Sequence, residues 1–243
     1  MSPAINTTEI DTTWWSETES PKAWMSVRDA DLYEALLHKL AQLRSGAPIR
    51  VVEWGAGKST LWYTGYLEHL GVPYTWLALE HNKGFFDQHC APSLRKRENV
   101  TIVEAGSRGP GEVRELLDRH GAVVVVYDAG DVRPDLPGRE TDRAVDLDDY
   151  VSLPAQAGFE CDLAVIDGRK RRRCYLEAAR LIGDHGYAII HDAWRTHYQC
   201  SFSAYTSGRR FGDEWFIGTQ KDTSFEDVLP WHALERHALV DAK

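Results

Sequence analysis

The sequence predicts an α/β fold in which a mainly parallel sheet carries helices on both faces. Short apolar runs alternate with segments of helical periodicity, a glycine-containing turn follows the first run, and polar residues follow the ends of later runs. Such alternation indicates βαβ units, whose crossover helices cover both faces of a parallel sheet. Because ligands of these sheets bind beyond the C-terminal ends of the strands, functional residues are expected there.

The expected elements follow one another along the chain. A first helix from residue 26 is indicated by Leu32, Leu36, Leu40 and Leu43, with Gly46 just past its end. The expected strands are 49–53, 74–80, 100–104, 122–127, 161–167, 187–192 and 214–218. The later helices are expected at 59–70, 83–90, 112–119 and 174–182, with a final helix before the C-terminus. Residues 128–148 are rich in Asp, Arg, Pro and Gly, which predicts a loop.

The chain has 243 residues, which fits one large domain or one domain with an appendage. We divide it into an N-terminal arm and helix, residues 1–46, and a ligand-binding domain, residues 47–243. The arm contains Trp14, Trp15 and Trp24, so it is expected to pack onto the body or to cover a ligand.

Bulk properties exclude several classes of protein. No run of about 18 uncharged apolar residues is present, which argues against a membrane span. The polar N-terminus lacks an apolar signal core, and the four cysteines form no C-x-x-C pair, so a cytoplasmic protein with reduced thiols is expected. A formal net charge of −9 argues against a general nucleic-acid binder. A homo-oligomer stays open.

The turn after the first strand resembles two nucleotide motifs and fits neither. A P-loop needs a glycine five residues before the Gly57-Lys58 pair, and that position is Val52. The dinucleotide fingerprint fails at its third glycine, where the chain has Thr60.

What remains is a Gly-x-Gly turn between an acidic strand end and a helix that starts at Ser59 or Thr60. Gly55 and Gly57 allow a ligand close to the backbone, and Glu53 adds negative charge that a pyrophosphate would avoid. This pattern favours a nucleoside with a cationic or zwitterionic tail and no phosphates, and S-adenosylmethionine has that chemistry.

Polar residues at later strand ends complete a candidate site. Glu80 follows the second strand and suits the ribose hydroxyls, although it could instead cap the next helix. Ser107, after the third strand, is a weaker candidate for reading adenine. Asp167 ends a later strand and His191-Asp192 end the next, so two carboxylates and an imidazole should converge. Helix capping by the two acids is the alternative.

Four segments together resemble the class I S-adenosylmethionine-dependent methyltransferases, over roughly residues 48–195. They are the Val-Val-Glu-Trp-Gly-Ala-Gly-Lys-Ser-Thr run, Leu-Ala-Leu-Glu ending at Glu80, Leu-Ala-Val-Ile-Asp-Gly around Asp167, and Gly-Tyr-Ala-Ile-Ile-His-Asp ending at Asp192. The Ile-Asp-Gly and His-Asp strand ends are similar to those of small-molecule and carbohydrate O-methyltransferases, with a fainter likeness to plant glucuronoxylan methyltransferases.

The resemblance implies a Rossmann-like methyltransferase fold and roles for individual residues. Glu53, Gly55 and Gly57 would line the methionine portion of the cofactor, Ser59 and Thr60 would open the helix beneath it, and Glu80 would hold the ribose. Asp167 would lie next to the reactive methyl group. The metal-dependent relatives pair two acids where this chain has His191-Asp192.

The acceptor hydroxyl could therefore be activated in either of two ways. A neutral His191, oriented by Asp167 or Asp192, would take the proton of an acceptor hydroxyl. Alternatively, Asp167, His191 and Asp192 would hold Mg²⁺.

The expected acceptor is a small molecule or carbohydrate. A run of five cations follows Asp167-Gly168, and Arg169 and Arg173 within it are candidates for binding an anionic acceptor, whereas a solvated face is the plainer reading. Arg195, Arg209 and Arg210 could add to them. Trp194 would stack on the acceptor or pack in the core.

The leading function is thus an S-adenosylmethionine-dependent O-methyltransferase. An NAD-type oxidoreductase shares the strand, glycine turn and helix, but Thr60 and Glu53 disfavour it. A noncatalytic binding domain of the same fold would leave the strand-end acids without a task.

Overall fold

The computed structural model describes residues 25–119, 121–129 and 144–229. The three tryptophans of the N-terminal arm and residues 130–143 of the predicted loop lie outside the described residues, as does the end of the chain where a final helix was expected. None of the described helices combines the length and apolarity that crossing a bilayer requires.

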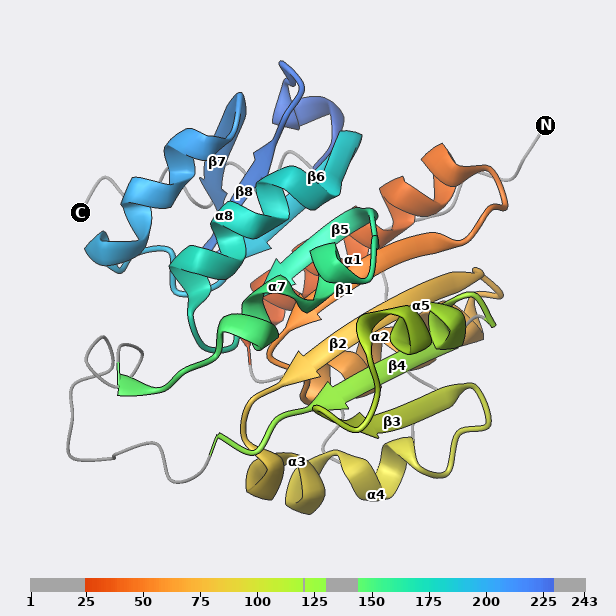
Figure 1. Cartoon of the computed structure of the whole chain (residues 1–243). Coiled ribbons are helices and arrows are strands. Elements are labelled where there is room, and N and C mark those ends of the chain that lie inside the picture. The colour runs from red at the N-terminus through yellow and green to blue at the C-terminus, as the bar shows by residue number, and fades with distance from the viewer. Residues whose placement is uncertain (1–24, 120, 130–143, 230–243) are drawn as a thin grey trace.

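The described strands form one sheet of eight in the order β3-β4-β2-β1-β5-β6-β8-β7 (Figure 1). The first six in this order run parallel to one another, whereas β8 is antiparallel to β6 and β7 is antiparallel to β8. The strands are β1 (Ile49–Trp54), β2 (Tyr74–Glu80), β3 (Val100–Glu104), β4 (Gly121–Val126), β5 (Cys161–Ile166), β6 (Ile182–Ile190), β7 (Ser207–Phe211) and β8 (Trp215–Thr219). The predicted fold class is confirmed.

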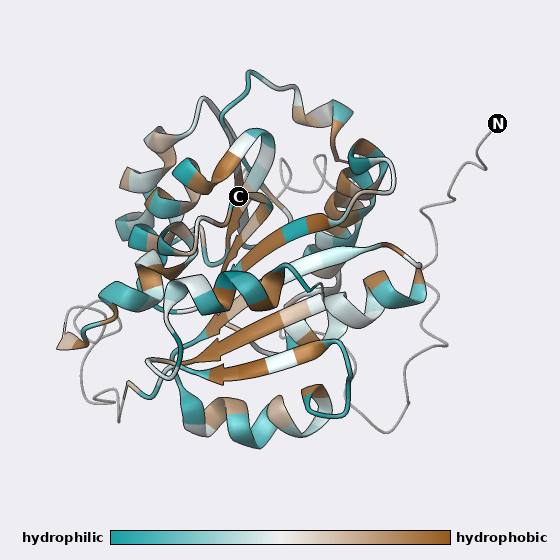
Figure 2. Ribbon diagram, turned by 45° about the vertical axis from the view of Figure 1, so that its right-hand side comes forward, coloured by the Kyte–Doolittle hydropathy of each residue, from teal (hydrophilic) through white to brown (hydrophobic). Residues whose placement is uncertain are grey.

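Helices cover both faces of the sheet, and each face has its own apolar core. One face carries α1, α2, α3 and α4, and the other carries α5, α7, α8 and the 3-10 helix η1 (Figure 1). Their bounds are α1 (Val27–Arg44), α2 (Lys58–His69), α3 (Lys83–His89), α4 (Ala91–Leu94), α5 (Pro110–Leu117), α7 (Asp148–Gln156), α8 (Arg171–Leu181), η1 (Thr196–Ala204) and the 3-10 turn η2 (Phe225–Asp227). Buried strands β4 and β5 are apolar along most of their length, as the brown strands in Figure 2 show.

The helix of the predicted N-terminal segment belongs to the main body. The Ser26 hydroxyl accepts the backbone N–H of Asp29 and so caps α1. Leu32, Leu36 and Leu40 then pack into the same core as β1 and α2. Helix α1 is therefore packed against the sheet through its buried leucines.

Strand β4 lies between β2 and β3 in the sheet. The apolar run expected at 122–127 is β4, and it pairs with β2 on one side and β3 on the other. Strand β3 is therefore the edge strand, and the turn with Ser107 follows a strand that does not touch β2.

An antiparallel hairpin closes the opposite edge of the sheet. Of its two strands, β8 was predicted and β7 was not. The carboxylate of Asp29 on α1 accepts the backbone N–H of Asp213 in the hairpin turn at 2.7 Å. This contact fixes the hairpin that carries Glu214 and Trp215 toward the C-terminal edge of β6.

Candidate active site

A cavity of about 510 Å³ opens at the C-terminal ends of β1, β2, β5 and β6, a size typical of small-molecule sites. Its wall comes from the turn after β1, the start of α2, the segment after β2, the start of α8 and the segment after β6. The lining residues are Met25, Gly55, Ala56, Gly57, Lys58, Ser59, Glu80, His81, Asn82, Phe85, Asp167, Gly168, Arg169, Arg171, His191, Asp192, Arg195 and Tyr198.

The two glycines of the β1–α2 turn are required for different reasons. Gly55 has a φ of +108°, and a Cβ there would stand 2.5 Å from the backbone nitrogen of Gly168. Gly57 has no positive φ, and its Cβ would meet nothing closer than 3.8 Å. The fold thus demands Gly55, whereas Gly57 leaves open space on the cavity wall.

Glu53 lies beneath this turn and does not line the cavity. Its carboxylate is fully buried and accepts hydrogen bonds from Ser59 Oγ, from Thr60 Oγ1 at 2.7 Å and from Trp76 Nε1 at 2.9 Å. Burial raises the pKa of Glu53 to about 7, against the lowering effect of the three donors. The group ties the first turn of α2 to β1 and β2.

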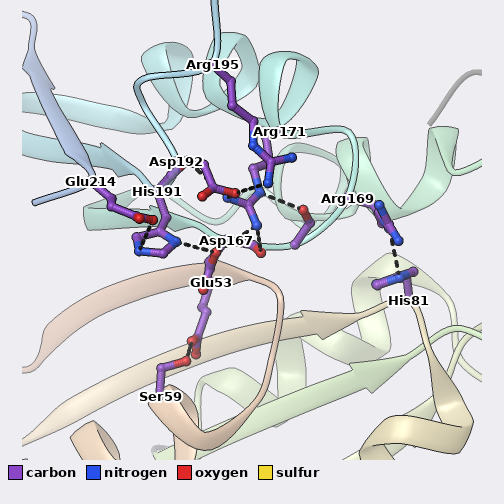
Figure 3. A network of polar contacts seen from close by, with 11 residues as sticks. Glu53, Ser59, His81, Asp167, Arg169, Arg171, His191, Asp192, Arg195 and Glu214 are labelled. Carbon is purple, nitrogen blue, oxygen red and sulfur yellow. Dashed lines mark hydrogen bonds and ion pairs between the residues drawn. The ribbon is translucent and has the colours of Figure 1, made fainter. Parts of the chain in front are cut away.

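Glu80 reaches the cavity from the end of β2. Its side chain is almost fully buried, and Oε1 accepts the backbone N–H of Asn82 at 2.8 Å. His81 Nδ1 lies 2.9 Å from the same oxygen, and Arg169 Nε lies 3.4 Å from His81 Nε2. Arg169 therefore extends toward His81, away from His191 (Figure 3).

At the other end of the cavity, His191 stands between two carboxylates (Figure 3). Nδ1 lies 3.1 Å from Asp167 Oδ1, Nε2 lies 3.4 Å from Glu214 Oε2, and the ring packs 4.7 Å from that of Trp215. Burial lowers the pKa of His191, but the hydrogen bond and charge of Asp167 outweigh it and raise the pKa above its ordinary value. Burial likewise raises the pKa of Asp167, but Arg171 and His191 outweigh it and lower the pKa.

Arg171 joins the two strand ends that carry these groups. Its guanidinium lies 2.9 Å from Asp167 Oδ1 and 2.9 Å from Asp192 Oδ2. It also donates to three backbone carbonyls, those of Asp167 at 2.8 Å, Gly168 at 3.0 Å and His191 at 3.0 Å. A second guanidinium, that of Arg195, lies 2.8 Å from Asp192 Oδ2.

The cavity brings together most of the residues that the sequence singled out. Those in its wall are Gly55, Gly57, Ser59, Glu80, Asp167, Arg169, His191 and Asp192. Those outside it are Glu53, Thr60, Ser107, Arg173 and Trp194. Arg173 pairs with Asp148, and Trp194 is 55% exposed with the Arg195 guanidinium 5.2 Å above its ring. Tyr198, which lines the cavity, is buried on the 3-10 helix η1.

Sequence reasoning missed Glu214 and did not single out Arg171 within the run of five cations, whereas it named Arg195 as a possible contact of the acceptor. Helix α8 begins three residues earlier than predicted, at Arg171, whose guanidinium reaches Asp167, four residues earlier and outside the helix. The signal that the sequence offers for Arg171 is its place in the run of cations after Asp167-Gly168. Glu214 has none, because it reaches His191 only through the antiparallel pairing of β8 with β6.

The donor set does not fit the Mg²⁺ site that the sequence left open. Asp167 Oδ1 already faces both His191 Nδ1 and Arg171, and Asp192 Oδ2 faces two guanidiniums. His191, Asp192 and Glu214 do offer ligand-type atoms within 4.8 Å of one another. A cation there would stand beside Arg171 and Arg195, which already pair with the carboxylate of Asp192.

Comparisons with known proteins give partial likenesses. No family model and no curated protein matches the sequence. Among solved structures, a methyltransferase-like protein from Silicibacter pomeroyi DSS-3 is 17% identical and covers 89% of this chain and 94% of its own, with a TM-score of 0.47. A cofactor-bound protein from MTB is 16% identical over 83% of this chain and 84% of its own, with a TM-score of 0.49.

A TehB-like SAM-dependent methyltransferase from Corynebacterium glutamicum is 13% identical over 74% of this chain and 86% of its own, with a TM-score of 0.37. The solved structures that this chain resembles thus include methyltransferases. At such identities and TM-scores the likenesses assign neither family nor activity, so the function has to be inferred from the cavity.

Proposed function

We propose that the protein is an S-adenosylmethionine-dependent O-methyltransferase acting on a hydroxyl of a small molecule or carbohydrate. The observation that carries the proposal is the joining of two sites in one cavity. The Gly55–Gly57 turn and the Glu80 carboxylate line the same cavity as the His191–Asp167 pair. A nucleoside cofactor with a reactive tail fits this arrangement, since its tail would point at the base.

The cofactor end suits an adenosyl group without phosphates. Glu80 offers carboxylate oxygens to the ribose hydroxyls, and the space beside Gly57 lets the cofactor approach the backbone. The buried Glu53 carboxylate sits under the N-terminus of α2, where a phosphate binder would use the helix dipole. An acidic group there suits a sulfonium better than a pyrophosphate.

The acceptor end supplies the proton transfer. Methyl transfer is an in-line displacement in which the acceptor oxygen attacks the methyl carbon and the carbon–sulfur bond breaks. The hydroxyl proton passes to the imidazole of neutral His191, and Asp167, whose Oδ1 lies 3.1 Å from Nδ1, stabilises the imidazolium that forms. S-adenosylhomocysteine and the methyl ether are the products.

Arg195 is the cation of this end that could bind an anionic acceptor. Its Nη2 faces Asp192, while its buried Nε has no hydrogen-bond partner among the described residues. A carboxylate or phosphate on the acceptor would satisfy that nitrogen. Arg173, paired with Asp148 outside the cavity, is not part of this proposal.

Calorimetry separates this function from its alternatives. We expect S-adenosylhomocysteine to bind with micromolar affinity and NAD not to bind; the reverse result would favour an oxidoreductase.

His191→Gln should bind S-adenosylhomocysteine as the wild type does but lose on the order of 10²-fold in kcat. Methyl release from labelled cofactor, with paired acidic and neutral sugars as acceptors, measures that loss. Cofactor binding without turnover on any acceptor would favour a noncatalytic domain.

A further inference from the structure

The charges around His191 present a problem for a base. Asp167 after β5, Asp192 after β6 and Glu214 before β8 all face the ring, and Asp29 of α1 acts on it from farther away. Carboxylates on several sides favour the imidazolium, which cannot accept a proton. Positive charge must offset these carboxylates if His191 is to accept a proton near neutral pH.

Two cations face the same group of side chains. Arg171 of α8 contacts the carboxylates of Asp167 and Asp192, each at 2.9 Å, and its side chain is only 14% exposed. Arg195, before η1, pairs with Asp192, and its side chain is 37% exposed. Glu214, whose side chain is 40% exposed, lies 3.4 Å from His191 Nε2.

We propose that Arg171 limits the protonation of His191, and so helps it to accept a proton, by neutralising the carboxylates of Asp167 and Asp192. This role rests on the proposed function of His191 as the base. Arg171 touches neither reactant in the proposal, so it is a positioning residue that acts through the two acids.

The backbone contacts explain why a guanidinium serves here. Donation to the carbonyls of Asp167, Gly168 and His191 fixes the planar group between two adjacent strand ends. Its charge therefore stays at one distance from both acids. A lysine has a single ammonium and could not make this set of contacts at once. The charge of Arg171 also acts to lower the pKa of His191, as the proposal requires.

The test is the titration of His191 followed by NMR, without cofactor or acceptor. The His191 signals are assigned by their loss in His191→Gln. In Arg171→Met we expect the pKa of His191 to rise by about one unit. Arg173→Met removes a cation two positions along the same helix, outside the cavity, and should leave that pKa unchanged. An unchanged or lowered pKa in folded Arg171→Met would overturn the proposal.

Asp192→Asn keeps the proposal falsifiable if Arg171→Met does not fold. Removing one of the acids should lower the pKa of His191, and a rise would contradict the proposal. Where activity is measurable, kcat/KM of Arg171→Met should fall about tenfold near neutral pH and recover at a pH one unit higher. A loss that is equal at every pH would indicate a merely structural role. Because the NMR titration needs no substrate, its outcome is independent of the proposed function.

Discussion

Gly55 and Gly57 belong to one turn, but the protein fold requires a glycine only at position 55. Gly55 combines a left-handed backbone with a close approach to Gly168, so its small size serves the packing of β1 against the end of β5. Gly57 has ordinary space around its Cα, and no protein atom explains why a side chain is lacking. A ligand on the cavity wall would explain it.

Replacing each glycine with alanine separates these constraints. Gly55→Ala should destabilise the fold by about 1–3 kcal/mol or more, because the strained φ adds to a backbone clash. Gly57→Ala should change the free energy of unfolding by no more than about 0.5 kcal/mol. We expect it nonetheless to weaken S-adenosylhomocysteine binding at least about tenfold, or 1.4 kcal/mol. Urea unfolding and calorimetry measure the two effects, and unaltered affinity in Gly57→Ala would place the ligand elsewhere.

At the scale of elements, the antiparallel hairpin completes a site that the parallel strands begin. Strands β5 and β6 end at Asp167 and His191, but Glu214 and Trp215, which flank the imidazole, come from the start of β8. The backbone N–H of Asp213 in the hairpin turn donates to Asp29 of α1. Gly212 in this turn has a φ of +62°, and a Cβ there would strike Asp29.

Asp29 should therefore control the mobility of the hairpin. Asp29→Ala removes the acceptor of the Asp213 N–H and should cost about 1–3 kcal/mol. We expect faster hydrogen exchange at the amides of β7 and β8 in this variant. Asp29→Asn is the matched control, since its side-chain oxygen still accepts that hydrogen bond. Equal exchange rates in the two variants would mean that other contacts hold the hairpin.

At the scale of the molecule, the buried Glu53 links stability to pH. Burial raises the pKa of Glu53 to about 7 in the folded protein, from the ordinary value of 4.5 that applies to the unfolded chain. Between these values the folded state holds a proton that the unfolded chain has released, so stability falls as the pH rises. The stability that depends on the protonation of Glu53 is fully present below about pH 4.5 and is lost above about pH 7.

Glu53→Gln should remove this dependence. Its amide oxygen can accept from Thr60 and Trp76, and its NH₂ can donate to Ser59, so the variant is expected to fold. Between acidic pH and pH 8, wild-type stability should fall relative to that of the variant by on the order of 3 kcal/mol. Urea unfolding at several pH values measures this. Parallel stability curves would show that Glu53 keeps one protonation state throughout.

The convergence of Glu80, Asp167 and His191 followed from the sequence, because parallel strands bring their C-terminal ends to one edge of the sheet. Each of these side chains lies at or just after a strand end, where an apolar run stops. Glu53 was expected beside them but occupies the position before the last residue of β1. Alternation along a strand turns its side chain to the face under α2, away from the edge.

The sequence by itself determined the fold class, the glycine turn and the polar strand ends, because these depend on local periodicity and on the backbone freedom of glycine. Only the tertiary structure decided that β4 separates β3 from β2 and so keeps Ser107 out of the cavity wall. It likewise decided that Arg171, Arg195 and Glu214 surround the His191 site. Strand order and the directions of long charged side chains depend on contacts between distant segments, which no local pattern encodes.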